Sequence, residues 1–367
     1  MNQHSMHGGR IFEASRQTGR PINDWLDFSA NLNPAGPPPW LTEEIIASVN
    51  LLTHYPDTYC TTLRETLSAE SGLPTEAFLA GNGVTELLYL LPRALGWNKA
   101  LILSPTYADY AWATVLAGGK IVHTEMSEDH NFSWDPQEIA STYSEVQPDA
   151  IFVCNPNNPT GYLAPRENLE ELIRLFPKSV LVVDESFLPL TDTPSNSLCN
   201  NVIENKRLII LRSLTKCFAI PGLRIGYLCA HPTVIARVKS FQEPWSVNTI
   251  AQQVAIRALH DKAYLTKSRQ LVGQYRANLI SGLQQTIPQM KIYPAKANFI
   301  LIRISEMIFT AEQLAEELFK QGVLVRTSTG FIGLEPAHYL RLAVRPPDEV
   351  KRLIMLLAQI TEGIKIC

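Results

Sequence analysis

Residues 211–227 read LRSLTKCFAIPGLRIGY, and an apolar run lies on each side of the polar centre of this segment. Residues 208–211 predict a strand that enters it, and residues 225–230 predict a strand that leaves it. The centre holds a single lysine, Lys216, whose amine loses its proton more easily among apolar neighbours. A neutral amine can form a Schiff base with a carbonyl compound. A pair of core strands with a lysine that reaches solvent would produce the same pattern.

Arg224 follows Lys216 by eight positions and lies between Gly222 and Gly226. Glycine lets a ligand approach the backbone closely, and arginine binds oxyanions through paired hydrogen bonds. A lysine next to an anion site suits pyridoxal phosphate, because this cofactor has an aldehyde to be bound and a phosphate to be held. The segment therefore predicts a pyridoxal phosphate site.

Strand and helix patterns alternate through the middle of the chain. Most of the expected strands are continuous apolar runs, which is typical of strands buried on both faces. Alternation of this kind predicts an α/β fold with a mostly parallel sheet flanked by helices. The expected strands are residues 100–104, 121–125, 150–154, 180–184, 208–211 and 225–230, with helical patterns such as 107–116 and 167–176 between them.

Polar side chains follow or close several of these strands, and in open α/β sheets the ligand binds beyond the carboxyl ends of the strands. Tyr107 and Asn158 each follow a strand, Asp184 closes another, and Lys216 follows a fourth. A carboxylate at the end of an apolar run is costly unless it meets a cation, such as a protonated pyridine nitrogen. The turn at residues 155–161 is locked by prolines, and its amides can donate hydrogen bonds to a ring oxygen.

Residues 79–88 read LAGNGVTELL and predict a short strand, a glycine turn and the start of a helix. The two glycines let the backbone approach a ligand, and the first-turn N–H groups favour an anion. A plain turn with a helix cap is the more common explanation of the same letters.

Both ends of the chain differ from the middle. The first forty residues are expected to be irregular, with Phe28, Leu32 and Trp40 as apolar anchors of a docked arm. Two long helices are expected at 248–264 and 267–283, followed by a small α+β domain. Its strands are expected at 298–302, 323–326 and 339–344, and its helices at 311–321 and 348–361.

We therefore expect three parts: an N-terminal arm over residues 1–45 that packs with the small domain, a large domain over 46–265, and a small C-terminal domain over 266–367. Arg326, Arg341 and Arg345 lie in or beside strands of the last part. An arginine on an apolar strand needs an anionic partner if it faces inward, while an edge or solvent position needs none.

The composition excludes several classes of protein. The net charge of −3 argues against a nucleic-acid partner, and the short apolar runs argue against a membrane span. The six cysteines form no CxxC motif and the N-terminus lacks the pattern of a secretory signal, so we expect a cytoplasmic protein. The sequence contains neither a P-loop nor metal-ligand spacing, so we expect no metal.

Together, NPTG at 158–161, Asp184-Glu185, SLTK at 213–216 and GLRIG at 222–226 resemble the fold type I pyridoxal-phosphate enzymes, the aspartate aminotransferase superfamily, over nearly the whole chain. Within that superfamily the chain resembles most the L-threonine-O-3-phosphate decarboxylases of cobalamin synthesis, and next the histidinol-phosphate aminotransferases. Aminotransferases of that branch typically have tyrosine where this chain has Phe187, and lack the second of the arginines 341 and 345. The motifs similar to the decarboxylases are HGG at 7–9, DFSANLNP at 27–34, GNGVTE at 81–86, PWSVN at 244–248 and YLRLAVR at 339–345.

The resemblance implies a sheet of the seven-stranded type and a role for each matching residue. Lys216 is implied to bind the aldehyde and Asp184 to pair with the ring nitrogen, as the catalytic residues. Asn158 is implied to donate to the ring hydroxyl oxygen and Tyr107 to stack on the ring. The cofactor phosphate is implied to be held by Ser213, Arg224 and backbone N–H groups around Asn82, Gly83 and Val84, with Tyr55 reaching it from the partner in a homodimer.

A small phosphorylated amino acid is the implied substrate. The implied reaction is decarboxylation of L-threonine O-3-phosphate to (R)-1-amino-2-propanol O-2-phosphate. Transamination of histidinol phosphate is the alternative, and a non-catalytic binding protein of the same fold is a third hypothesis. The residues implied to receive the substrate are His7, Gly8, Asn31, Asn158, Arg326, Arg341 and Arg345.

Overall fold

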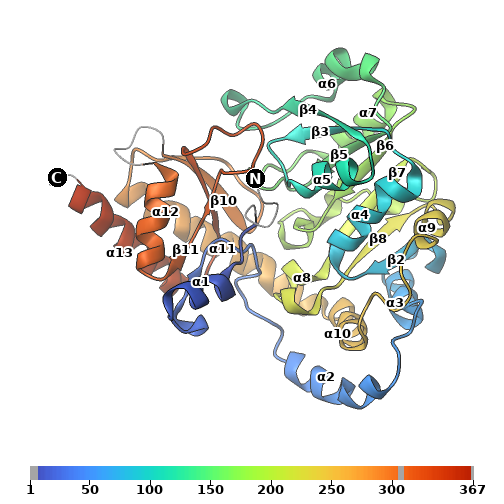
Figure 1. Ribbon diagram of the computed structural model, residues 1–367, viewed down its shortest axis with the longest axis horizontal. Helices are drawn as coiled ribbons and strands as arrows, with labels where there is room; N and C mark the ends of the chain where they lie inside the picture. The colour runs from blue at the N-terminus through green and yellow to red at the C-terminus, as the bar shows by residue number, and fades with distance from the viewer. Residues whose placement is uncertain (1–6, 305–309, 365–367) are drawn as a thin grey trace.

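The computed structural model describes residues 7–304 and 310–364 of the chain. Residues 1–6, on which the expectation about a secretory signal partly rests, lie outside them. Figure 1 shows two layered parts side by side, one coloured cyan to yellow and the other mainly orange to red. Among the described residues, none of the helices combines the length and the apolar content needed to cross a bilayer.

The larger part is built on a seven-stranded sheet with the order β2-β8-β7-β6-β5-β3-β4. Every neighbouring pair is parallel except those of β8, which is antiparallel to β7 and to β2. The expected α/β fold is therefore confirmed. The strands are β2 (Phe78–Gly81), β3 (Lys99–Ser104), β4 (Lys120–Glu125), β5 (Ala150–Cys154), β6 (Val180–Asp184), β7 (Leu208–Ser213) and β8 (Gly226–Ala230).

Both faces of this sheet are covered by helices, which explains why its strands are continuous apolar runs. Ile151 and Val153 of β5 pack into one core with residues of α3, α6, α7 and α10. Phe152 of the same strand packs into a second core with residues of α4, α5 and α9. The helices are α3 (Thr61–Ser71), α4 (Gly83–Leu95), α5 (Asp109–Leu116), α6 (Pro136–Tyr143), α7 (Arg166–Leu175), α8 (Leu214–Cys217), α9 (Pro232–Lys239) and α10 (Thr249–His260).

The smaller part is a four-stranded antiparallel sheet with the order β12-β13-β10-β9. Alternate residues of β10 face different cores: Ile300 packs into the core of the small sheet, and Leu301 packs into a core of the large sheet. One face of the small sheet therefore looks toward the large one. The elements are α11 (Lys262–Thr286), β9 (Lys291–Ile292), β10 (Phe299–Arg303), α12 (Ala311–Lys320), β12 (Arg326–Thr327), β13 (Tyr339–Ala343) and α13 (Pro347–Ile364).

The N-terminal segment packs on the smaller part. Strand β1 (Leu26–Asp27) pairs in parallel with β11 (Val323–Leu324), and Phe28 is buried in the core of the small sheet. The expectation of an irregular arm was wrong in one respect, since α1 (Ile11–Thr18) forms and ends at Gly19 in the left-handed conformation. Helix α2 (Leu41–Ser48) leads into the larger part. These contacts support, as a proposal, the division into residues 1–45, 46–265 and 266–367.

Candidate active site

The side chain of Asp184 is buried at the carboxyl end of β6, where it is 6% exposed. Its Oδ2 accepts a hydrogen bond from the Tyr110 hydroxyl at 2.8 Å, and its Oδ1 accepts one from the backbone N–H of Ser186 at 2.9 Å. Burial raises the pKa of this carboxyl, and the two donors oppose that rise. A cation placed beside Asp184 would therefore be held strongly.

Lys216 is half-buried in α8, the helical turn that directly follows β7. Strand β7 lies next to β6, with Leu211 in register with Asp184, so the lysine and the carboxylate come from neighbouring strand ends. Burial, followed by the positive charges of Arg341 and Arg224, lowers the pKa of Lys216 to about 8, whereas Asp184 acts to raise it. The amine can thus become neutral at moderate pH, which formation of a Schiff base requires.

A cradle for an anion lies at the start of α4. Gly83 adopts φ +76°, and a Cβ at this position would lie 2.6 Å from Nη2 of Arg224. A Cβ on Gly226 would lie 2.9 Å from the backbone N of Val84. Two glycines thus leave room between an exposed arginine and the first turn of a helix, where N–H groups favour negative charge.

Two further residues expected at this anion site already have hydrogen-bond partners. The backbone N–H of Asn82 donates to the Glu86 carboxylate at 2.5 Å. The hydroxyl of Ser213 lies 2.7 Å from that of Thr215, and both side chains are buried. Both donors therefore have partners within the chain. A phosphate bound here would replace the Glu86 carboxylate as the acceptor of the Asn82 N–H.

Tyr107 lies between strand β3 and helix α5, and its ring is half-buried. Its hydroxyl donates to Oδ2 of Asp109 at 2.7 Å, and Oδ1 of Asp109 lies 3.3 Å from Nε2 of His7. The rings of His7 and Tyr107 are 5.7 Å apart between centroids. The N-terminal segment thus reaches the residue that the sequence analysis expects to stack on the cofactor ring.

Two arginines from the small sheet face each other across a strand pair. Arg326 of β12 is in register with Arg341 of β13, and each side chain is 7% exposed. Arg326 donates to the carbonyl of Thr329 at 2.8 Å, and Arg341 donates to the Asn158 side-chain oxygen at 2.6 Å and to the carbonyl of Ser29.

Burial lowers the pKa of Arg326 to about 10, and burial together with the charge of Arg326 lowers that of Arg341 to about 9. An anionic ligand would offset the cost of holding two positive charges side by side.

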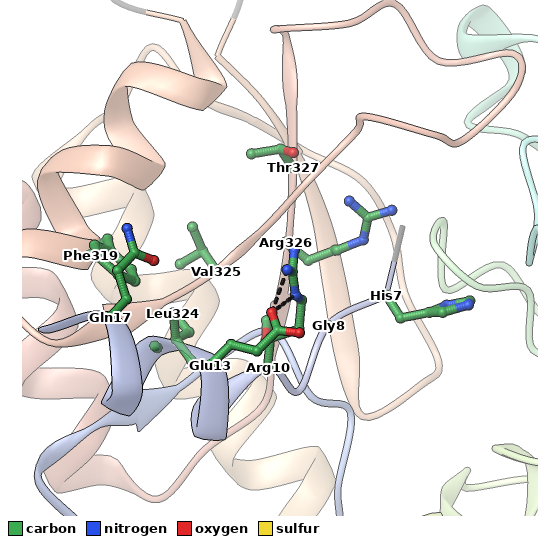
Figure 2. A pocket seen from close by; sticks show the side chains of 12 residues that line it. His7, Gly8, Arg10, Glu13, Gln17, Phe319, Leu324, Val325, Arg326 and Thr327 are labelled. Atoms are coloured by element: carbon green, nitrogen blue, oxygen red, sulfur yellow. Dashed lines mark hydrogen bonds and ion pairs between the residues drawn. The ribbon is translucent and has the colours of Figure 1, made fainter. Parts of the chain in front are cut away.

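A groove of about 270 Å³ runs along the N-terminal segment and reaches Arg326 (Figure 2). His7 and Arg326 point to the same side of this groove, away from Gln17 and Phe319. Gly8 lines it too, and a Cβ on Gly8 would collide with the Ser29 carbonyl oxygen at 2.1 Å. Because Gly8 has no side chain, the backbone passes close to Ser29, and His7 lies on the same side of the groove as Arg326.

Several buried polar atoms around the arginines have no hydrogen-bond partner within the described part of the chain. They include Oδ1 of Asn31, Oδ1 of Asn298 and Nε of Arg341. Asn298 donates to the carbonyl of Leu32, so both asparagines lie where the N-terminal segment meets the small sheet. Most buried polar groups have a hydrogen-bond partner, so these atoms are candidates for contacts with a ligand.

Two other expected residues lie in different surroundings. Arg345 follows the end of β13, and its guanidinium is paired with Glu349 at 2.8 Å in the first turn of α13. Tyr55 is 79% exposed and stacks on Trp245 with ring centroids 4.6 Å apart. The structure therefore brings Arg326 and Arg341 together, while Arg345 is engaged by α13 and Tyr55 faces outward.

Two residues of the site were missed from the sequence. Tyr110 supports Asp184 and also stacks on Phe152, with ring centroids 5.2 Å apart. Asp109 connects His7 with Tyr107. The clue was the spacing of Tyr107 and Tyr110, which lie three positions apart and so fall on the same side of a helical turn.

The arrangement fits pyridoxal phosphate. It offers an amine of lowered pKa, a buried carboxylate for a ring nitrogen, and a glycine cradle beside an arginine for a phosphate. Within residues 7–304 and 310–364, the structure has no group of three or more His, Cys, Asp or Glu side chains that could hold a metal ion.

Comparison with known proteins agrees with this chemistry. A family model described as aminotransferase class I and II matches residues 23–357. The chain is 32% identical to a threonine-phosphate decarboxylase from Salmonella typhimurium, covering 98% of each chain. It is 31% identical to a histidinol-phosphate aminotransferase from Moorella thermoacetica, covering 88% of this chain and 82% of that protein. It is also 33% identical to an adenosylcobalamin biosynthesis bifunctional protein from Leptospira interrogans, covering 98% of this chain but only 41% of the longer relative.

Solved structures show the same fold. The histidinol-phosphate aminotransferase from Clostridium acetobutylicum has a TM-score of 0.85 at 29% identity, covering 92% of this chain and 99% of that one. The L-threonine-O-3-phosphate decarboxylase from Porphyromonas gingivalis has a TM-score of 0.81 at 26% identity, with the same coverage. The expected resemblance to fold type I enzymes and the expected cofactor are therefore confirmed. This chain belongs to the aminotransferase class I and II family, whose enzymes use pyridoxal phosphate.

Proposed function

We propose that this enzyme decarboxylates L-threonine O-3-phosphate to (R)-1-amino-2-propanol O-2-phosphate in cobalamin biosynthesis, with pyridoxal phosphate as cofactor. The observation that carries the proposal is the cross-strand pair of Arg326 and Arg341. A small substrate with a phosphate at one end and a carboxylate at the other needs two cationic groups a few ångströms apart. His7 lies in the same groove as Arg326 and adds a third polar contact for the phosphate.

When bound at this site, pyridoxal phosphate supplies an aldehyde for amines and a ring that accepts electrons from the substrate Cα. Lys216 would hold that aldehyde through its Nζ. Once the substrate amine has taken its place, the same nitrogen would be available to return a proton to the substrate Cα. The lowered pKa of Lys216 suits both tasks, because the same nitrogen has to be neutral at one stage and protonated at another.

Asp184 is the residue proposed to pair with the ring nitrogen. Its carboxylate stabilises a protonated ring nitrogen, which strengthens the ring as an electron acceptor. Tyr110 and the Ser186 N–H orient the carboxylate and favour its ionised form, which opposes the rise in its pKa caused by burial. These roles for Asp184 and Lys216 are common to decarboxylation and transamination.

Selection between the two reactions depends on how the substrate is held. By fixing where the substrate carboxylate lies, the two arginines would determine which bond to Cα is oriented for cleavage. Phe187 packs edge-on against Phe299 at 5.0 Å and offers no hydroxyl to the ring oxygen. Asn158 is thus the residue that we propose to donate a hydrogen bond to the ring oxygen.

Transamination of histidinol phosphate is the second candidate. Its support is the 31% identity to a histidinol-phosphate aminotransferase and the TM-score of 0.85 to a solved one. That substrate has a phosphate but no carboxylate, so it presents one anionic group to the site where O-phospho-L-threonine presents two.

We also propose a homodimer in which Tyr55 of each copy reaches the cofactor phosphate of the other. Tyr55 belongs to an exposed apolar segment that includes Leu51 and Leu52, which are 41% and 53% exposed. A second copy would cover this surface. Sedimentation of the holoenzyme should give twice the mass of 41.0 kDa.

The deciding experiment is product analysis with the purified holoenzyme. Incubation with O-phospho-L-threonine should release CO2 and an equal amount of 1-amino-2-propanol phosphate without any oxo acid. Histidinol phosphate with 2-oxoglutarate should give no glutamate. Glutamate formation without CO2 release would replace the proposed activity with the second candidate, and the Lys216→Ala protein should be inactive in both assays.

A further inference from the structure

Glu128 joins the two parts of the molecule through a single carboxylate. It opens η5 (Glu128–His130), a short 3-10 helix that follows β4 at the edge of the large sheet. Its oxygens accept hydrogen bonds from Tyr293 at 2.5 Å, Tyr339 at 2.6 Å and Arg303 at 2.6 Å, and from Lys291 at 3.1 Å.

All four donors belong to the small sheet or to the residue next to it. Lys291 lies in β9, Tyr293 follows it, Arg303 ends β10 and Tyr339 begins β13. Arg303 and Tyr339 are in register as neighbours, so both reach the carboxylate from the same face of the sheet. One side chain of the large part therefore contacts three of the four strands of the small sheet.

Buried aromatic rings pack next to the contact between Glu128 and the small sheet. Phe132, four residues after Glu128, is 1% exposed, and its ring lies 5.0 Å from that of Tyr293 and 6.4 Å from that of Tyr339. Phe132 adopts φ +60°, which is costly for a bulky side chain. Packing against the two tyrosines therefore outweighs local strain, and the loop that bears Glu128 is fixed.

The charge of Glu128 persists at every pH at which such an enzyme works. Burial by itself would raise the pKa of this carboxyl, but the donors from Arg303, Tyr293, Tyr339 and Lys291 outweigh it and lower the pKa to about 2. Hydrogen bonds to an ionised acceptor are about twice as strong as neutral ones.

Strand β13 contains both Tyr339, which contacts Glu128, and Arg341 of the arginine pair. Tyr339 and Arg341 are two residues apart on one strand, so their side chains share the face that looks toward the large sheet, about 7 Å apart along the strand. Arg326 is in register with Arg341 on β12. A shift of the Tyr339 end of β13 relative to the large sheet would therefore displace both arginines from the cofactor site.

We propose that Glu128 is a positioning residue that ties β13 to the large sheet and so sets where Arg341 and Arg326 hold the substrate. It touches neither substrate nor cofactor, and it acts through Tyr339 and Arg303. This inference rests on the proposed function only in that the two arginines receive a substrate anion.

The test compares Glu128→Gln with Glu125→Gln, which removes the same charge from an exposed position on β4. In Glu128→Gln the KM for O-phospho-L-threonine should rise about tenfold, the change expected for a loss of about 1.4 kcal/mol, with kcat altered less than about twofold. The absorbance of bound cofactor should stay as in the unmodified enzyme, because Lys216 and the glycine cradle lie on the large part. Tyr339→Phe should raise KM too, and the double variant should raise it by less than the product of the two effects.

A merely structural role gives a different result. It predicts a lower melting temperature with KM unchanged, or loss of cofactor together with activity, and either outcome overturns the proposal. If the unmodified protein converts neither candidate substrate, hydrogen exchange still tests the contact. Amides of Tyr339–Ala343 should then exchange faster in Glu128→Gln than in Glu125→Gln, and equal rates would refute the inference independently of the proposed function.

Discussion

The guanidinium of Arg341 donates a hydrogen bond to the side-chain oxygen of Asn158 at 2.6 Å. This bond joins β13 of the small sheet to the turn that follows β5 of the large one. Because the amide oxygen is engaged by the arginine, the amide nitrogen of Asn158 is the group left to face a ligand. The residue expected to recognise the cofactor and the residue expected to recognise the substrate are therefore oriented by each other.

Replacing Arg341 should damage substrate binding much more than cofactor binding. In Arg341→Gln we expect KM for O-phospho-L-threonine to rise by about a hundredfold, since truncating a buried charge partner costs about 2–5 kcal/mol. Arg345→Gln is the matched control, because the Arg345 guanidinium is paired with Glu349. Steady-state kinetics of both variants make the comparison. An equal rise in KM for Arg345→Gln would mean that Arg345 also holds the substrate.

Covalent capture of the cofactor by Lys216 should depend on pH with a midpoint near the lysine pKa of about 8. The amine is protonated below this value and cannot attack an aldehyde, so capture should increase as the pH rises through it. Borohydride reduction followed by intact mass measurement gives the captured fraction at each pH. Arg341→Gln removes a positive charge that lowers this pKa, so the midpoint should move to higher pH. A midpoint near the ordinary lysine value of 10.5 would contradict the burial of this amine.

A side chain at Gly83 should disturb the cofactor site because it would displace the end of the Arg224 side chain, and not only because of the backbone conformation. Gly83→Ala places a Cβ 2.6 Å from Arg224, whereas Gly72→Ala at nearly the same φ meets nothing within 4 Å. Both variants incur the left-handed cost of about 1 kcal/mol. Only Gly83→Ala should weaken cofactor binding, by about tenfold or more, since about 1.4 kcal/mol corresponds to that factor. Equilibrium dialysis with pyridoxal phosphate measures this, and equal loss in both variants would show that strain alone is responsible.

The large sheet could be predicted from the sequence because its strands are buried on both faces. Ala150–Cys154 and Val180–Asp184 are unbroken apolar runs, and their observed bounds match the expected ones. Polar residues at the ends of such runs are visible as well, which is why Asp184 and Lys216 were found. Helix α1 was missed because it has only eight residues, of which only Ala14 is buried, and so short a segment gives a weak helical signal in the sequence.

The resemblance implied Arg326, Arg341 and Arg345 as substrate residues, but the pairing of Arg326 with Arg341 could not be predicted, because it depends on strand register. Arg341 and Arg345 would share a face if β13 continued. The strand ends at Ala343, however, and Arg345 then meets Glu349 on the next helix. Arg326 becomes the neighbour of Arg341 only through pairing of β12 with β13. Long-range pairing of this kind leaves no local signal in the sequence.

Tyr110 should control the acid limb of the pH profile through its hydrogen bond to Asp184 at 2.8 Å. Burial raises the pKa of Asp184, and the tyrosine hydroxyl lowers it by stabilising the ionised form. The ionised carboxylate is the useful form, so activity should be lost as the pH falls through this pKa. Tyr110→Phe removes the donor and should move the acid limb of kcat/KM to higher pH by about one unit, since a hydrogen bond contributes about 1 kcal/mol.

Tyr143→Phe is the control for that change, because it removes a tyrosine hydroxyl that donates to the His123 carbonyl instead. Its acid limb should coincide with that of the unmodified enzyme. The ring of Tyr110 keeps its stacking on Phe152 in the phenylalanine variant, so a shift of the limb can be assigned to the lost hydroxyl and not to altered packing. If the limb stays in place while kcat falls, Tyr110 orients Asp184 without controlling its charge.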